Sequence, residues 1–434
     1  MVAAAPQFVA SLEAEQLEAL RGLASEHKVC DRCLGRFVGK SGTGFSNPER
    51  GRVIRSQLQV PAIAESACDL CEGSFAEADH LAKLVTKAWS HLEFSSFVVG
   101  CKLDAWIVAR EREWLERLGT SFKDLAEPMK TEMNREIGRR VEAATGKKVD
   151  FLRPEITVLV DTRFDHVDLQ IASVYLQGRY RKLVRGIPQT RWPCRSCRGA
   201  GCNRCNQTGK MYEESVEELT AAIPMKLLEA KEHAFHGMGR EDIDALMLGG
   251  GRPFVVELKE PRLRTLDLPS VQDAINRAAA GKVEILDLRP ATKDDVVAVK
   301  SSAAAKSYVA VCEASQEVPA EKLLSTLPSL RGVLISQRTP SRVSHRRADL
   351  VRTRRVLDVE LVAHQGKQFT LRITAEAGTY IKELVSSDDG RTEPSLAGLL
   401  GVPCVVTALD VVDVADGGAE GTGEAPERED EEVS

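Results

Sequence analysis

The chain has 434 residues, of which 43% are hydrophobic and 28% charged, and its formal net charge is −5. No apolar run approaches the ~18 residues that a membrane-spanning helix needs, so the composition excludes a membrane protein. The N-terminal stretch lacks basic residues ahead of its short apolar run, which argues against a secretory signal peptide. We therefore expect a globular protein of the cytoplasm, long enough for about three domains.

The negative charge is concentrated at the C-terminal end of the chain. Residues 411–434 carry a net charge of −8 from nine acidic residues and one arginine, so the remainder carries +3. Local basic stretches, rather than the overall charge, mark phosphate-binding surfaces, and arginine suits phosphate especially well. Two such stretches predict contact with RNA, with a solvated charged face as the alternative for each. They are Arg179, Arg181, Lys182, Arg185 and Arg191, and Arg338, Arg342, Arg346, Arg347, Arg352, Arg354 and Arg355.

The first predicted element is a helix over residues 8–27, which carries its leucines on roughly one face. Two Cys-x-x-Cys pairs follow, Cys30 with Cys33 and Cys68 with Cys71. Each pair turns two sulfurs toward one point, and two pairs together make a tetrahedral thiolate cage for Zn²⁺. Four thiolates leave no open position for a substrate, so the predicted role of this zinc is structural.

Residues 73–191 alternate between helical and strand patterns. Helical patterns cover 82–97 and 109–145, and strand patterns cover 97–102, 155–160 and 167–174. The stretch from Tyr175 to Arg185 predicts a basic hairpin. Within it, Tyr180 is either an ordinary exposed strand tyrosine or a residue that stacks on an RNA base.

A second set of four cysteines lies in the segment 192–210, at Cys194, Cys197, Cys202 and Cys205. The doubled Cys-x-x-Cys spacing predicts a second zinc cage. A redox-active cysteine pair is the alternative, and the doubling argues against it. We expect this zinc knuckle to link two domains.

Residues 211–415 contain many valine-rich strand patterns with helices between them. That mixture predicts a mixed, mostly antiparallel sheet flanked by helices. A long arginine hairpin is predicted over 337–352, between two strands. The tail at 416–434 has no apolar periodicity, and we expect it to be disordered. The predicted fold class is therefore α+β, with several domains.

The segment from His236 to Phe254 is rich in glycine at both ends and holds Arg240 and Asp242 between them. In extended backbone, residues two apart point to the same side, and a neighbouring guanidinium keeps a carboxylate ionised. An ionised aspartate flanked by glycines suits a nucleophile that a substrate approaches closely. The alternative is a polar hairpin with Gly249–Gly251 as its turn.

Two later segments favour the catalytic interpretation. The order Gly239-Arg240-Glu241-Asp242, then Lys306-Ser307-Tyr308, then Gly378-Thr379-Tyr380-Ile381-Lys382 resembles an RNA pseudouridine synthase. Two sequence segments resemble those of the archaeal and eukaryotic tRNA enzymes that modify positions 54 and 55 of the TΨC arm. They are Gly-Arg-Glu-Asp-Ile-Asp and, after it, Gly-Arg-Pro-Phe-Val-Val-Glu-Leu. The resemblance runs from about Cys30 to about Leu409. Within it, the pattern of residues 73–191 is similar to a THUMP domain, an RNA-binding module.

The resemblance implies a role for each matching residue. Asp242 would be the nucleophile, with Asp244 as the alternative, and Lys382 would pair with Asp242. Tyr308 would stack on the target uracil and take the C5 proton, with Tyr380 close to Lys382. Leu400 or Leu399 would close the pocket, with Leu396 less favoured. We also expect RNA contacts from Arg240, Arg346 and Arg347.

The reaction that the resemblance implies breaks the uridine N1–C1′ bond and rejoins the base through C5. Net composition does not change, so we expect no catalytic cofactor, only structural Zn²⁺ at one or two sites. The partner would be tRNA, whose target uridine must be flipped out of its stack, and the protein would act as a monomer. Two alternatives remain, a non-catalytic zinc-containing tRNA-binding adaptor and another THUMP-containing tRNA-modifying enzyme. The expected domains are 1–72 (helix and zinc cage), 73–191 (THUMP-like), 192–210 (zinc knuckle), 211–415 (catalytic) and 416–434 (tail).

Overall fold

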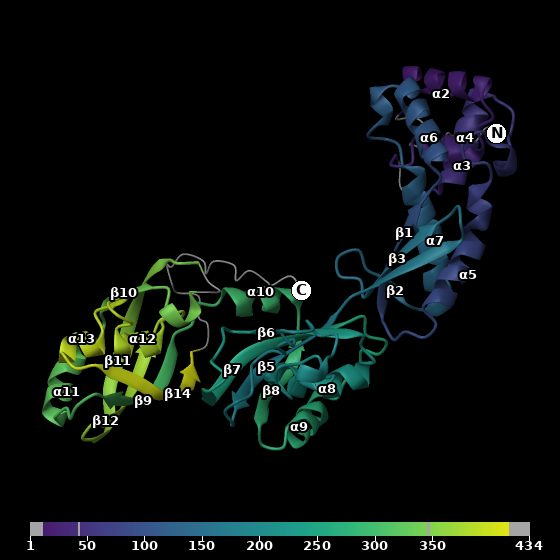
Figure 1. The fold of residues 1–434 in the computed structure, drawn as a ribbon. Coiled ribbons are helices and arrows are strands. Elements are labelled where there is room, and N and C mark those ends of the chain that lie inside the picture. The colour runs from purple at the N-terminus through teal and green to yellow at the C-terminus, as the bar shows by residue number, and fades with distance from the viewer. Residues whose placement is uncertain (1–11, 42–43, 345–347, 416–434) are drawn as a thin grey trace. The chain divides into compact units, whose positions relative to one another are not determined.

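The computed structural model describes residues 12–41, 44–344 and 348–415, which form two compact units divided between Ala172 and Ser173 (Figure 1). Each unit has a hydrophobic core of its own. No helix among the described residues is long and apolar enough to span a membrane. The predicted C-terminal tail lies outside the described residues.

The N-terminal unit combines helices with a four-stranded sheet of order β2-β1-β3-β4. Strand β1 is parallel to β2 and β3, whereas β4 is antiparallel to β3. Alternate side chains of β1, Phe97, Val99 and Cys101, are buried, as expected for a strand with one face on a core. The elements are α2 (Ala14–Glu26), α3 (Asp31–Arg36), α4 (Asn47–Leu58), α5 (Ala78–Ala88), β1 (Ser96–Lys102), α6 (Ala105–Leu118), α7 (Met129–Thr145), β2 (Lys148–Val149), β3 (Ile156–Asp161) and β4 (His166–Ile171).

The helical pattern predicted over 109–145 is two helices rather than one. Helix α6 ends at Leu118, because Gly119 takes a positive φ of 98° that a helix cannot continue. Helix α7 begins after Pro128, whose fixed φ suits the position just before a helix. Gly119 and Pro128 are the signals in the sequence that mark this break.

Helices α3 and α4 cross with their backbones in contact, and glycine makes the crossing possible. A Cβ added at Gly51 of α4 would lie 1.7 Å from the main-chain oxygen of Asp31, and one at Gly35 of α3 would lie 1.9 Å from that of Asn47. Both distances are far below van der Waals contact. The two helices bring Cys30 and Cys33 beside the rest of the N-terminal core.

We predict that Gly51→Ala lowers the free energy of unfolding of the N-terminal unit by about 3 kcal/mol, because the backbones must move apart. Gly22→Ala is the matched control, since a Cβ at this position of α2 would meet nothing within 4 Å. Because alanine is the better helix former, the control should gain up to about 1 kcal/mol. Denaturant unfolding measures both; equal stabilities would mean that the helices do not cross in this way.

The C-terminal unit is built on one ten-stranded sheet of order β13-β10-β11-β12-β9-β14-β7-β5-β8, with β6 paired to β7. In the described part of this sheet, the short pairing of β14 with β7 is parallel and the other pairings are antiparallel, which confirms the mixed, mostly antiparallel sheet. The strands are β5 (Val174–Lys182), β6 (Glu232–Gly237), β7 (Leu246–Lys259), β8 (Val283–Ala291), β9 (Lys306–Ala314), β10 (Leu334–Arg338), β11 (Val351–Gln365), β12 (Gln368–Ala375), β13 (Thr392–Glu393) and β14 (Cys404–Val414).

Helices flank this sheet. Helices α8 and α10 contact β6 and β7, α9 contacts β8, α11 contacts β11, and α12 contacts β14 (Figure 1). Together they cover the apolar core that runs from Leu176 to Val414. The helices are α8 (Val216–Leu228), α9 (Leu268–Ala278), α10 (Lys293–Ser301), α11 (Ala320–Thr326), α12 (Ile381–Ser386) and α13 (Leu396–Leu400).

The predicted basic hairpin over 175–185 is wrong. Strand β5 lies inside the large sheet, paired with β7 on one side and β8 on the other. Tyr180 is buried against Phe235 and Phe254, so it is neither an exposed strand tyrosine nor a base-stacking residue. The boundary predicted at residue 191 also moves, because the chain enters the C-terminal sheet at Val174.

The first basic stretch is used within the protein. Arg179 donates to the main-chain oxygens of Gly250 and Val414, at 2.7 and 2.8 Å, and Arg181 donates to that of Gly249 at 2.6 Å. Arg185 pairs with Asp410 at 2.7 Å. These contacts join β5 and the residues that follow it to β7 and β14, so the basic stretch has a role within the sheet.

Candidate active site and metal centres

Asp242 lies in the loop between β6 and β7. The extended backbone predicted there is wrong, because residues 242–245 form a turn in which the Ala245 amide donates to the Asp242 carbonyl at 3.1 Å. Gly239 begins the loop with a positive φ of 73°, the left-handed conformation that glycine permits. The Asp242 side chain is 38% exposed, so a substrate has access to it.

Two cations approach the Asp242 carboxylate. Lys382 Nζ lies 3.3 Å from Asp242 Oδ2, as the resemblance implies. Arg342 NH1 lies 3.5 Å from the same oxygen and is held by Glu383, to which Arg342 Nε donates at 2.7 Å. Arg240, the guanidinium predicted to accompany Asp242, instead lies over the Trp192 ring at 5.2 Å. The arginine beside Asp242 is therefore Arg342.

Asp244 is also within reach of Lys382, whose Nζ donates to Asp244 Oδ2 at 3.1 Å. Burial opposes ionisation of Asp244, but Lys382 more than offsets it, and the pKa of Asp244 is lowered. Its side chain is 69% exposed, against 38% for Asp242. Lys382 thus bridges the two aspartates, and Asp242 is the more enclosed of them.

Tyr308 lies on β9, and only 9% of it is exposed. Burial raises the pKa of Tyr308, and the neighbouring Arg252 partly opposes that shift. Tyr380 directly precedes α12, and its main-chain N–H and C=O are both bound by the Gln337 side chain, at 2.9 and 3.0 Å. This double contact fixes the start of the helix that carries Lys382.

The leucines expected to close the pocket lie on α13. Leu400 and Leu396 are buried, whereas Leu399 is 41% exposed. The short helix begins at Ser395, whose hydroxyl accepts from the Gly398 amide at 3.2 Å. The structure therefore places Leu400 in the core and leaves Leu399 outside it.

The arginine hairpin predicted over 337–352 is confirmed in its strands, since β10 pairs antiparallel with β11 and Arg338 faces Val351. The predicted RNA contacts Arg346 and Arg347 lie outside the described residues.

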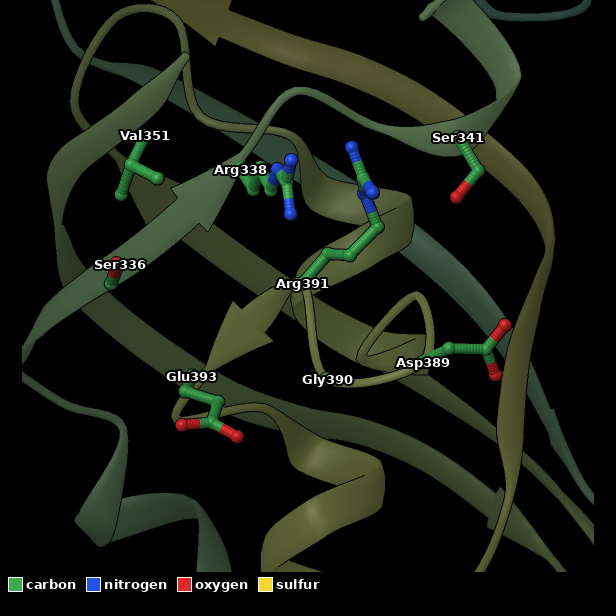
Figure 2. A pocket seen from close by; sticks show the side chains of 8 residues that line it. All are labelled: Ser336, Arg338, Ser341, Val351, Asp389, Gly390, Arg391 and Glu393. Carbon is green, nitrogen blue, oxygen red and sulfur yellow. The ribbon is translucent and has the colours of Figure 1, made fainter. Parts of the chain in front are cut away.

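A cavity of about 530 Å³ opens at the hairpin base (Figure 2). Arg338 and Arg391 line it, and both bind Asp349, at 2.9 and 3.1 Å. Asp242, Tyr308 and Lys382 do not line this cavity.

The first four cysteines come together as predicted. Their sulfurs all lie within 4.8 Å of one another, and Cys30 Sγ is 3.7 Å from Cys71 Sγ. A tetrahedral zinc with bonds of about 2.3 Å requires sulfur separations of about 3.8 Å. The Cys33 and Cys30 amides also point at sulfurs, at 3.4 and 3.3 Å, which suits thiolates. The residues present therefore fit a Cys₄ metal centre.

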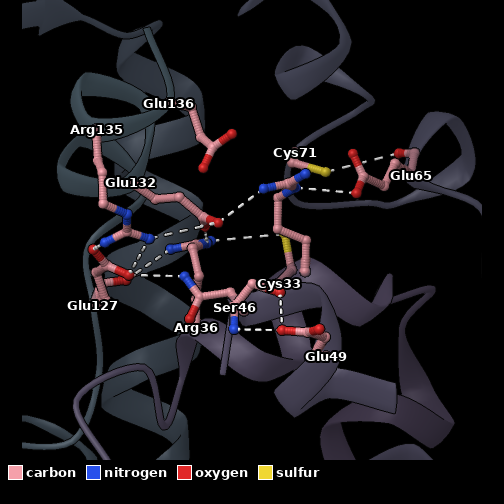
Figure 3. Close-up of polar contacts among 12 residues, drawn as sticks. Cys33, Arg36, Ser46, Glu49, Glu65, Cys71, Glu127, Glu132, Arg135 and Glu136 are labelled. Atoms are coloured by element: carbon pink, nitrogen blue, oxygen red, sulfur yellow. Dashed lines mark hydrogen bonds and ion pairs between the residues drawn. The ribbon is translucent and has the colours of Figure 1, made fainter. Parts of the chain in front are cut away.

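Charged side chains surround this first cage (Figure 3). Arg36 NH2 lies 3.7 Å from Cys33 Sγ, and the same buried guanidinium pairs with Glu111 and Glu132. Arg32 links Glu65 and Glu132 at 3.0 and 2.9 Å. Cations beside thiolates offset the negative charge of a four-sulfur site.

The second cysteine set also converges. Cys194 lies 3.9 Å from Cys202, and Cys205 lies 3.8 and 3.7 Å from Cys197 and Cys202, sulfur to sulfur. The amides of Gly201 and Gly209 point at Cys197 and Cys205 sulfurs, both at 3.2 Å. This set too fits a Cys₄ metal centre, in a turn-rich segment between β5 and α8.

An aspartate bridged to a lysine, beside a buried tyrosine and on a mixed sheet, occurs here in the motif order of an RNA pseudouridine synthase. Comparison with known proteins agrees. Residues 175–415 match the family model "Pus10, C-terminal", and residues 81–161 match "Pus10 THUMP domain, archaeal". The N-terminal unit thus contains the THUMP domain that the sequence pattern suggests.

Curated relatives extend the match over nearly the whole chain. "tRNA pseudouridine synthase Pus10" of Halorubrum lacusprofundi is 43% identical over 93% of this chain and 96% of its own. The proteins of the same name from Methanothrix thermoacetophila and Methanopyrus kandleri are 44% and 39% identical, over 89% and 93% of this chain and 91% and 99% of theirs. The chain belongs to the Pus10 family. Its reaction class is that of a tRNA pseudouridine synthase, an isomerase, rather than an adaptor or another THUMP-containing enzyme.

Proposed function

We propose that this enzyme converts uridine to pseudouridine at position 54, position 55 or both in the TΨC arm of tRNA, as a monomer and without a catalytic cofactor. The observation that carries the proposal is the pairing of Asp242 with Lys382 and Arg342, within 3.5 Å, on a loop open to substrate. A non-catalytic tRNA-binding adaptor would not need a carboxylate held by two cations. The antiparallel arginine hairpin supplies basic surface near the same loop through Arg342.

In the proposed mechanism Asp242 acts on the sugar of the flipped-out uridine, by attack at C1′ or by removal of the C2′ proton. The N1–C1′ bond breaks, the freed uracil rotates, and C5 bonds to C1′. On the first route this step breaks the bond between Asp242 and C1′, and on the second Asp242 returns its proton to C2′. The C5 proton then leaves and N1 gains a proton, so the composition of the nucleotide is unchanged. Lys382 and Arg342 orient the Asp242 carboxylate, and Leu400 excludes water from the pocket.

Tyr308 has two expected roles, stacking on the uracil and accepting the C5 proton. Its pKa is raised by burial, which keeps the phenol protonated at neutral pH. A protonated phenol stacks well but is a poor base. We therefore propose stacking as the main role of Tyr308, with Tyr380 as a further contact to substrate.

We propose that both cysteine cages hold Zn²⁺. Bound zinc would cross-link the backbone and take no part in the reaction, because four sulfurs fill its coordination shell. The cage of Cys30, Cys33, Cys68 and Cys71 would hold the N-terminal core together. The segment 192–210 would be a separate knuckle within the C-terminal unit, between β5 and α8, and not the predicted link between two domains.

Pseudouridine mapping tests the choice of position. An unmodified tRNA transcript, and transcripts with cytidine at position 54 or at position 55, are incubated with the protein and no added cofactor. We expect pseudouridine in the TΨC arm, lost at whichever position is replaced. Pseudouridine confined to another arm would contradict the proposed site while leaving the reaction class intact.

A further inference from the structure

A cluster of buried charged and polar side chains lies beneath the Asp242 loop. We call Tyr180, Lys182, Glu241 and Arg252 the buried clamp. Glu241 directly precedes Asp242 and pairs with Arg252, whose Nε lies 2.8 Å from Glu241 Oε2. The Tyr180 hydroxyl donates to both Glu241 oxygens, at 2.9 and 2.7 Å. Burying such charges is costly unless they are paired, and the contacts of Arg252 and Tyr180 with Glu241 oppose that cost.

Lys182 connects the clamp to the main chain of the catalytic loop. Its Nζ donates to the carbonyl oxygens of Ile187 at 3.0 Å, Asp242 at 3.1 Å and Ile243 at 3.2 Å. An ammonium has three donors, and these three contacts use all of them. Lys182 ends β5, a strand paired on both sides, so the contacts run from a rigid part of the sheet to the residue that carries the carboxylate.

The residues before Asp242 are held from the same side. Arg252 NH1 donates to the Met238 carbonyl at 2.7 Å, and the Gln189 side chain donates to the Gly239 carbonyl at 2.9 Å. A Cβ added at Gly239 would lie 3.4 Å from Arg252 NH1, so the loop fits closely on the clamp. The main chain is thus anchored on both sides of Asp242.

We propose that Lys182 is a positioning residue for Asp242, and that the buried clamp fixes the main chain so that the carboxylate meets Lys382 and the sugar. The inference rests on the proposed role of Asp242. A general structural role in the core is the competing explanation. The two explanations predict different effects of removing Lys182. A positioning role predicts a slower reaction of the bound complex, whereas a structural role predicts a loss of stability alone.

The test is Lys182→Met, which keeps the length of the side chain and removes the ammonium. It removes one of the two cations near Glu241, whose Oε1 lies 4.0 Å from Lys182 Nζ, and leaves Glu241 paired with Arg252. We expect the single-turnover rate constant at saturating protein to fall about 100-fold, the effect of a catalytic group displaced by about 1 Å, while the Kd for tRNA stays unchanged. Tyr180→Phe, which removes only a hydroxyl, should fold even if Lys182→Met does not, and should lower the same rate about tenfold.

Ile275→Val is the matched control, because Ile275 is fully buried on α9 and is not one of the four clamp residues. It should lower Tm and leave the rate constant of the bound complex unchanged. The inference is overturned if the clamp variants keep the rate of Ile275→Val, or if rate and tRNA affinity fall together. Asp242→Asn in the same assay distinguishes failure of the proposed function from failure of the positioning role. If Asp242→Asn is active, the proposed function is wrong. If Asp242→Asn is inactive and Lys182→Met is fully active, only the positioning role of Lys182 is wrong.

Discussion

Asp242→Asn is expected to lower the rate of pseudouridine formation by at least about 10⁴-fold, because the amide keeps the shape of the side chain but can neither attack carbon nor take a proton. Its affinity for tRNA should stay the same or rise slightly, since Lys382 and Arg342 then face the RNA without their shared anion. Release of tritium from C5-labelled uridine measures the rate in a single turnover. Filter binding of the same tRNA measures the affinity.

Asp244→Asn is the matched control for that prediction. It makes the same change of charge two residues away, on a carboxylate that also contacts Lys382 at 3.1 Å but is far more exposed. We expect less than about a tenfold loss of rate, because only the orientation of Lys382 changes. If Asp242→Asn stays active and Asp244→Asn is inactive, Asp244 is the nucleophile and Asp242 is not.

Loss of metal from the first cysteine cage is expected to unfold much of the N-terminal unit. The four cysteines are buried within its core. Structural zinc sites contribute about 10–16 kcal/mol of apparent binding energy, comparable with the ~5–15 kcal/mol total stability of a domain. Cys71→Ala should therefore give a protein with one zinc ion per chain, a lost unfolding transition and weakened tRNA binding.

Loss of metal from the second cysteine cage is expected to have a smaller effect on folding than loss from the first. Cys197 and Cys202 are partly exposed, and the knuckle lies outside the hydrophobic core of the C-terminal unit. Cys202→Ala should lose one zinc ion while the large sheet stays folded. Cys101→Ala, a buried cysteine outside both cages, should keep two. Elemental analysis counts the ions, and a folded wild-type protein without metal would contradict both assignments.

The parts of the site that sequence predicted are those that short spacing or family motifs encode. A Cys-x-x-Cys pair brings two sulfurs together through local backbone geometry alone, so both cages could be predicted. The Asp242–Lys382 contact joins residues 140 apart in the sequence, and only the resemblance implied it. Arg342 was expected to bind RNA, and nothing in the spacing shows that it also lies at Asp242.

Two of the errors concern side chains that are charged and yet buried. Lys182 stands in a basic stretch, which predicted an exposed hairpin, but its ammonium is fully buried under three carbonyls. Glu241 looked like the variable position of a motif and is instead the centre of the clamp. Burial of a charge depends on partners that are distant in sequence, so a single chain gives no local signal of it.

Nucleotide-resolution mapping tests whether the Asp242 loop forms pseudouridine in the TΨC arm. Wild type and Asp242→Asn are each saturated with the same unmodified tRNA, without any added cofactor, and the product is mapped over the whole transcript. We predict pseudouridine at position 54, position 55 or both with wild type, and none with Asp242→Asn at equal tRNA occupancy. Equal pseudouridine from both proteins would contradict the role of Asp242, and none from wild type despite tight binding would contradict the proposed function.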